Sequence, residues 1–137
     1  METYYKLVRT EDVLAFQNEI YETSKHALGA EHPDTVRAMS NLAIIMSNLE
    51  RLDDGVVLLK QVYEIRKRNL GDKHPDTQAS MNNLAFVYSS LGQHKEAFAL
   101  MQQLYEIRRR LFDEDHQLTL KTHTRLDEFK KQFLADS

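Results

Sequence analysis

Three histidines recur at one spacing, and they are the residues of this chain that most resemble a set of metal ligands. His32, His74 and His116 are each separated by 42 residues. Ligand atoms of one zinc ion lie about 2 Å from the metal, and hence about 3–4 Å from one another. Neighbouring helices have axes about 8–10 Å apart, so residues one structural repeat apart lie too far from each other. We therefore expect no metal site and interpret each histidine as a cap of the helix that follows it.

The other reactive side chains do not form a recognisable catalytic set. The chain has no cysteine, which excludes thiolate metal sites and cysteine nucleophiles. His123 precedes Asp127 by one helical turn, a spacing more typical of a surface pair than of a catalytic dyad. No phosphate-binding glycine loop and no nucleophile elbow is present. The sequence therefore predicts a protein that is not an enzyme and that binds no cofactor.

Composition limits the classes of partner. The chain has 18 Lys and Arg against 21 Asp and Glu, so no overall positive charge attracts nucleic acid. The two basic runs, at 66–68 and 108–110, are interpreted as cations that stabilise the carboxyl ends of helices. No run approaches the roughly 18 apolar residues of a membrane span. We expect a cytoplasmic protein with no nucleic-acid or membrane partner.

An internal repeat organises the elements that must position these residues. Residues 28–69 and 70–111 are identical at 19 positions, which chance does not produce. Each copy opens with Leu-Gly-x-x-His-Pro-Asp-Thr, and Pro followed by Asp suits the first turn of a helix. Two runs of apolar residues at three-and-four spacing follow in each copy, and a short polar break separates them. Each copy therefore predicts two helices, with Gly29 and Gly71 as stop signals.

Because a lone helix pair cannot bury its apolar faces, such pairs stack on one another. We expect an all-α fold, a right-handed α-solenoid of antiparallel helix hairpins, as a single domain over residues 1–137. Residues 32–69 and 74–111 would be the full repeats. Residues 117–135 would form a capping helix, and residues 11–28 the second helix of a partial repeat. The first helix of that partial repeat is expected to be missing or reduced to residues 3–9.

The units resemble tetratricopeptide repeats in the 42-residue form known from the kinesin light chain family, over roughly residues 11–126. The second full repeat has the family's leucine and small residue of the first helix, its aromatic residue, its turn glycine and the alanine of its second helix: Leu84-Ala85, Tyr88, Gly92 and Ala97. The first full repeat departs from the family pattern at Met46 and Gly55. Gly55 predicts a looser helix pair in this repeat, since glycine in a helix costs about 1 kcal/mol relative to Ala. The resemblance implies a protein-binding module whose first helices line a concave groove for a peptide.

One face of the predicted first helices is the candidate site. At about 100° per residue it lies opposite the apolar face, and it is polar except for Ile44 and Phe86. Apolar residues on a polar face are typical of a ligand site, and the alternative is that they pack against the protein's own wall. The predicted peptide-binding residues are Arg37, Asn41, Ile44, Asn48, Asn82, Asn83, Phe86, Ser90, Lys121 and Arg125.

Two kinds of side chain on this face suggest what it binds. Asn41 and Asn83 occupy the same place in two repeats, and an amide can pair with the backbone of an extended peptide or with a neighbouring helix. Arg37, Lys121 and Arg125 favour an acidic peptide, the alternative being cations that only solvate the surface. Asn83, Lys121 and Arg125 also match three positions of a clamp by which some tetratricopeptide domains bind a chaperone's acidic C-terminus. Two further clamp positions depart from that pattern, at Ser40 and Ile44.

A second hypothesis is structural. The incomplete N-terminal repeat leaves four residues without a full partner helix: Val13, Phe16, Ile20 and Tyr21. A second copy of the chain would cover them in a homodimer, and the assembly itself would then be the function. On this hypothesis the chain is an oligomerisation module or a fragment of a larger signalling protein.

Overall fold

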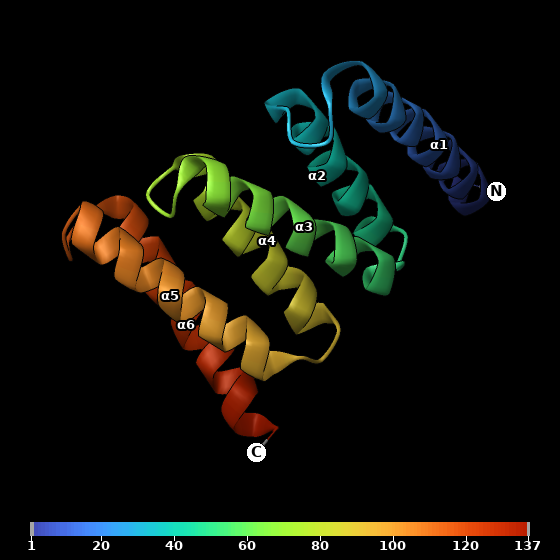
Figure 1. The fold of residues 1–137 in the computed structure, drawn as a ribbon. Coiled ribbons are helices and arrows are strands. Elements are labelled where there is room, and N and C mark those ends of the chain that lie inside the picture. The colour runs from blue at the N-terminus through green and yellow to red at the C-terminus, as the bar shows by residue number, and fades with distance from the viewer. Residues whose placement is uncertain (1, 137) are drawn as a thin grey trace. The chain divides into compact units, whose positions relative to one another are not determined.

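The computed structural model describes residues 2–136, with side chains described for residues 9–136. The described residues form α-helices and no strand: α1 (Glu2–Leu28), α2 (Pro33–Asn48), α3 (Leu52–Leu70), α4 (Pro75–Ser90), α5 (His94–Leu111) and α6 (Gln117–Ala135) (Figure 1). The predicted all-α fold is confirmed. No helix in this range is long and apolar enough to cross a membrane. The chain divides into two compact units, Met1–Ile65 and Arg66–Ser137.

The first unit consists of α1, α2 and most of α3. Its core joins residues of all three helices: Leu14, Tyr21, Val36, Met39, Leu42 and Val62. Helix α1 is continuous from Glu2, so residues 3–9 extend this helix and do not form a separate first helix. Tyr21 is only 9% exposed and belongs to the core. The prediction that Tyr21 forms part of an open edge is therefore wrong.

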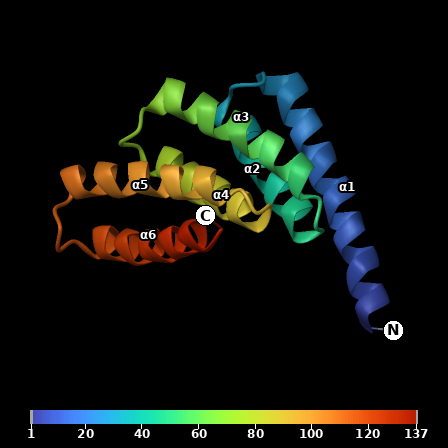
Figure 2. The same cartoon turned by 90° about the horizontal axis from the view of Figure 1, so that it is seen from below.

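The second unit consists of the last turn of α3 together with α4, α5 and α6. Helix α5 packs against both α4 and α6, and Figure 2 shows α5 and α6 side by side along their lengths. The buried apolar residues come from all three of these helices and include Met81, Leu84, Met101, Leu104 and Phe129.

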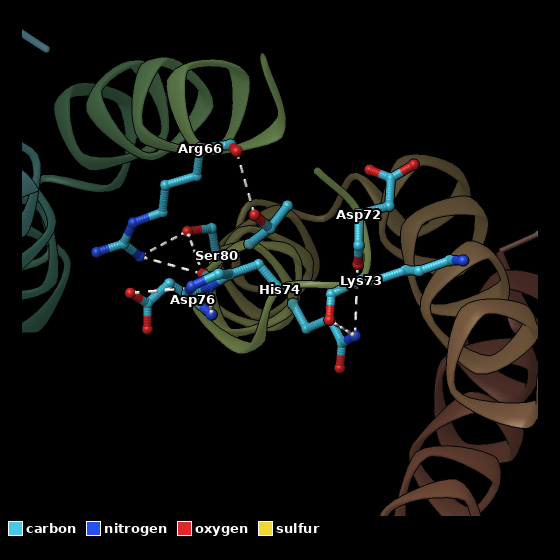
Figure 3. Close-up of polar contacts among 8 residues, drawn as sticks. Arg66, Asp72, Lys73, His74, Asp76 and Ser80 are labelled. Carbon is cyan, nitrogen blue, oxygen red and sulfur yellow. Dashed lines mark hydrogen bonds and ion pairs between the residues drawn. The ribbon is translucent and has the colours of Figure 1, made fainter. Parts of the chain in front are cut away.

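Each first helix begins with the same histidine cap. The Nδ1 atoms of His32, His74 and His116 accept a hydrogen bond from the backbone N–H two residues later, at 3.1, 3.0 and 3.1 Å. The bond satisfies one of the N–H groups that a helix leaves unpaired in its first turn. Figure 3 shows this cap for His74. The interpretation of the three histidines as helix caps is confirmed.

An arginine links the second helix of a repeat to the first helix of the next. Arg66 Nη1 donates to Ser80 Oγ at 2.7 Å (Figure 3). Forty-two residues later, Arg108 Nη1 donates to Thr122 Oγ1 at 2.7 Å, and Arg108 Nε donates to Gln78 Oε1 at 3.1 Å. Both basic runs thus contain an arginine that holds two helices together.

The junction between α1 and α2 lacks this arginine. The repeat offset places Ser24 at the arginine position and Ala38 at the hydroxyl position. The buried hydroxyl of Thr35 has no hydrogen-bond partner among the described residues, whereas the equivalent threonines later in the chain donate to the arginine carbonyl oxygens. At this junction Gln17 Nε2 instead donates to the carbonyl oxygen of Ala38 at 3.3 Å.

Gly55 permits a close contact between α2 and α3. A Cβ atom at Gly55 would lie 2.6 Å from Ser47 Oγ and 3.1 Å from the carbonyl oxygen of Ala43. Ala97, at the equivalent position of the second repeat, is fully buried. Because glycine allows this close approach, the prediction of a looser helix pair in the first unit is wrong at this contact.

Candidate functional site

The predicted residues of α2 lie on an exposed face of the first unit. Asn41 and Asn48 are exposed, and Ile44 is 38% exposed. The amide of Asn41 makes no side-chain hydrogen bond with any described residue. Arg37 is also exposed, but its Nη2 atom lies 3.7 Å from Asp34 Oδ1 on the same helix. An internal carboxylate therefore offsets part of the charge of Arg37.

In the second unit, Arg125 of α6 lies against two predicted residues of α4. Arg125 Nη1 donates to Asn82 Oδ1 at 3.1 Å, and its guanidinium carbon lies 5.6 Å from the centre of the Phe86 ring. A cation this close to an aromatic face is attracted by the ring. Together the two contacts hold the side chain in place. A guanidinium carries five N–H groups, so the bond to Asn82 leaves other donors available for a ligand.

Phe86 is supported by a second aromatic ring. The rings of Phe86 and Phe129 lie 5.4 Å apart at 63°, an edge-to-face arrangement. Phe86 nevertheless remains 44% exposed. The side chain thus packs partly against its own protein and partly remains accessible.

The other predicted residues of this face differ in how free they are. Lys121 is exposed one turn before Arg125, and neither cation forms an ion pair within the described residues. Asn83 is half-buried, and its amide makes no side-chain hydrogen bond within the same range. The hydroxyl of Ser90 donates to the carbonyl oxygen of Phe86 at 3.1 Å, which uses its only donor. Two unpaired cations and one unpaired amide are therefore available.

The electrostatic environment near Arg125 is positive. Burial lowers the pKa of Arg108, and the nearby charge of Arg125 lowers it further. Among residues 9–136, Arg108 donates only to neutral oxygen atoms, those of Gln78 and Thr122. Asp127 and Glu128 follow Arg125 within one turn of α6, and among the described residues neither forms an ion pair with it. Arg108, Lys121 and Arg125 together favour a negatively charged ligand.

A pocket of about 540 Å³ lies elsewhere in the second unit, between the end of α3 and α5. Its charged lining residues are Lys67, Asp72, Glu106 and Arg110. None of the predicted peptide-binding residues lines it. No three His, Asp or Glu residues of the described chain are grouped so that they would hold a metal ion.

Sequence reasoning missed two features of the second unit. Asn82 was included among the site residues without a specific role, yet it accepts the hydrogen bond that orients Arg125. The linking role of Arg66 and Arg108 was also missed. The signal was present, because Ser80 and Thr122 recur at the same offset as the arginines that they bind.

Comparison with known proteins identifies the repeat. A family model described as tetratricopeptide repeat matches residues 38–110 and 76–126. A Podosopora anserina protein, described as a kinesin light chain with nearly identical TPR-like repeats, is similar in structure, with a TM-score of 0.83 and 24% identity. The match covers 96% of this chain and 62% of that chain. BtubC (BKLC) from P. vanneervenii matches with a TM-score of 0.80 and 19% identity, over 90% of this chain and 50% of that chain.

The similarity to these solved proteins is a similarity of fold over part of their length. The chain spans less than two thirds of the length of either solved protein, and at these identities the likeness shows the fold. No curated protein matches the chain. The family-model matches run from residue 38 to residue 126, which is more than half of the 137 residues. Proteins of this repeat class generally act as protein–protein interaction modules. The chain belongs to the tetratricopeptide repeat family.

Proposed function

We propose that this protein is a non-catalytic adaptor of the cytoplasm that binds an extended acidic peptide. The carboxylate-binding part of the site is the exposed face of α4 and α6 in the second unit, with Lys121 and Arg125 as its cations. Asn83 supplies an amide for the peptide backbone, and Phe86 supplies a partly exposed apolar surface. The exposed face of α2, with Asn41 and Ile44, is proposed to bind peptide in the same manner.

One observation carries this proposal. Arg125 is held by Asn82 and by the ring of Phe86, and no described carboxylate pairs with it or with Lys121. A surface arginine that only solvates the protein has no need of two orienting contacts. Holding the guanidinium in one place reduces the entropy that binding would otherwise remove, and charge-assisted hydrogen bonds to a carboxylate are strong.

The test is a binding titration with two labelled probe peptides. A library of ten-residue peptides rich in Asp and Glu supplies the first probe, and the same peptide with Asn and Gln in place of the acids supplies the second. We expect only the acidic probe to bind, with an affinity that falls as salt is added. Arg125→Ala should weaken binding about tenfold to a hundredfold, because a hydrogen bond to a charged group contributes about 1.5–3 kcal/mol.

Two further variants separate the roles of the residues. Lys130→Ala removes an exposed cation of α6 that lies outside the predicted face, and it should leave the affinity unchanged. Asn83→Ala should weaken binding whichever acids the probe carries, because an amide reads the peptide backbone. The proposal fails if both probes bind equally, or if Lys130→Ala weakens binding as much as Arg125→Ala.

A further inference from the structure

An apolar stripe on α1 is exposed in the first unit. Val13, Phe16 and Ile20 are 50%, 64% and 38% exposed. At about 100° per residue these side chains project within about 60° of one another, so they form one face. Contiguous exposed apolar residues of this kind mark interaction surfaces. The stripe lies apart from the residues proposed above to bind peptide.

The repeat shows what kind of surface this is. Two repeats later, Ala97 and Leu104 occupy the positions of Val13 and Ile20 on α5, and both are fully buried. Helix α5 packs against α4, the first helix of its own repeat. The stripe on α1 is therefore the side that a helix covers in a complete repeat, and no described helix of the first unit covers it.

Helix α6, the last first helix of the described chain, is a poor occupant for this face. At the positions where α4 has Ala85 and Tyr88, α6 has Asp127 and Lys130. Packing α6 of one copy on α1 of the next would place these charges against an apolar stripe, and burying unpaired charge is strongly unfavourable. A head-to-tail stack of copies is thus disfavoured.

The stripe instead matches a second copy of itself. Phe16 lies near the middle of α1, with Val13 three residues before it and Ile20 four residues after it. If two α1 helices lie antiparallel with a two-fold axis near Phe16, Val13 of each copy meets Ile20 of the other. This is the self-complementary arrangement that a two-fold dimer requires.

We propose that a second copy of this chain covers the stripe, in an antiparallel dimer of α1 helices centred on Phe16. The three apolar side chains make the interface small, so the dissociation constant should be micromolar rather than nanomolar. Asp12 and Glu19 flank the stripe on one side and place like charges near each other in the dimer. Added salt should therefore tighten the dimer, opposite to its effect on acidic peptide binding.

Sedimentation equilibrium across a wide range of protein concentration tests the proposal. The wild-type chain should show a monomer–dimer equilibrium, and Phe16→Glu should weaken dimerisation at least tenfold because the change occurs twice in each dimer. Val57→Glu is the matched control, since Val57 is an apolar residue 53% exposed on α3 of the same unit. Its dimerisation should equal that of the wild type. A monomer at every concentration, or equal losses in the two variants, would overturn the proposal.

A cross-linking experiment tests the geometry without relying on the charged variants. The chain has no cysteine, so single-cysteine variants report one position each. Under oxidation, Phe16→Cys should form a covalent dimer, and Val57→Cys should not. A mixture of Val13→Cys and Ile20→Cys chains should cross-link more than either variant alone. Preferential cross-linking of like positions would refute the antiparallel arrangement.

Discussion

Replacing Asp113 by glycine should stabilise the protein by about 0.5 kcal/mol, even though it deletes a charged side chain and its hydrogen bond. Three helix ends of this chain are followed by a residue at the same repeat position: Gly29, Gly71 and Asp113. All three have positive φ angles, of 98°, 85° and 128°. Glycine adopts such angles without steric conflict, whereas a residue with a Cβ atom does so only under strain.

The expected magnitude is the balance of three terms. A non-glycine residue in such a conformation costs about 1–3 kcal/mol, which Asp113→Gly recovers. Glycine gains conformational freedom in the unfolded chain, which offsets about 0.4–1 kcal/mol. The substitution also removes the hydrogen bond from the backbone N–H of Asp115 to Asp113 Oδ1, at 3.0 Å, which contributes about 0.5–1 kcal/mol. The midpoints of these ranges leave a net stabilisation of about 0.5 kcal/mol.

Thermal unfolding followed by circular dichroism measures the effect, which should raise Tm by about 2 °C for a chain of this size. Gly71→Ala is the reciprocal control. A Cβ atom at Gly71 would meet nothing within 4 Å, so its effect isolates the backbone conformation and should lower Tm. A Tm that falls in Asp113→Gly as it does in Gly71→Ala would refute the reasoning.

Three further substitutions test contacts described above. Gly55→Ala alone should stabilise the protein little or destabilise it, because the new Cβ atom would meet Ser47 Oγ. Combined with Ser47→Ala, the change in the free energy of unfolding should be at least about 0.5 kcal/mol more favourable than the sum of the two single changes. A double-mutant cycle of urea unfolding measures this difference. His74→Ala should lower the free energy of unfolding by about 1 kcal/mol because it removes the helix cap, and His74→Asn should lower it much less because asparagine also caps helices. Equal losses of stability for the two variants in urea unfolding would contradict the capping role. Arg108→Ala should cost about 2 kcal/mol because it leaves the side-chain amide oxygen of the buried Gln78 without its donor. Exposed Arg110→Ala should stay within about 0.5 kcal/mol in the same assay.

Much of the helical architecture was predictable from the repeat. Proline after histidine placed the starts of α2 and α4, and Gln117 to Ala135 was expected as a helix with the bounds that the structure has. These features are local, because caps and the apolar period act within a few residues. The extent of α1 was harder to predict, since Thr3 to Arg9 carries no cap or stop signal that separates it from the rest of the helix.

The contacts within the candidate site were less predictable. Helical spacing and the repeat offset place Phe86 and Arg125 on equivalent faces of their two helices, but the bond from Arg125 to Asn82 depends on how α6 packs against α4. Tyr21 was placed on the open edge because the incomplete N-terminal repeat gives its helix no full partner helix, yet the rotation of α1 turns it into the core. Helix rotation is set by tertiary packing, which the spacing of apolar residues does not determine by itself.

The missing arginine at the junction of α1 and α2 has a consequence for how the molecule opens. In repeat proteins, stability is approximately a sum of terms for each unit and each junction between neighbours. The junctions at Arg66 and Arg108 contain a partly buried, charge-assisted link, whereas Ser24 and Ala38 supply none. Amide protons of α1 should therefore exchange with deuterium sooner than those of α5, and a force applied at the amino end would peel α1 away first.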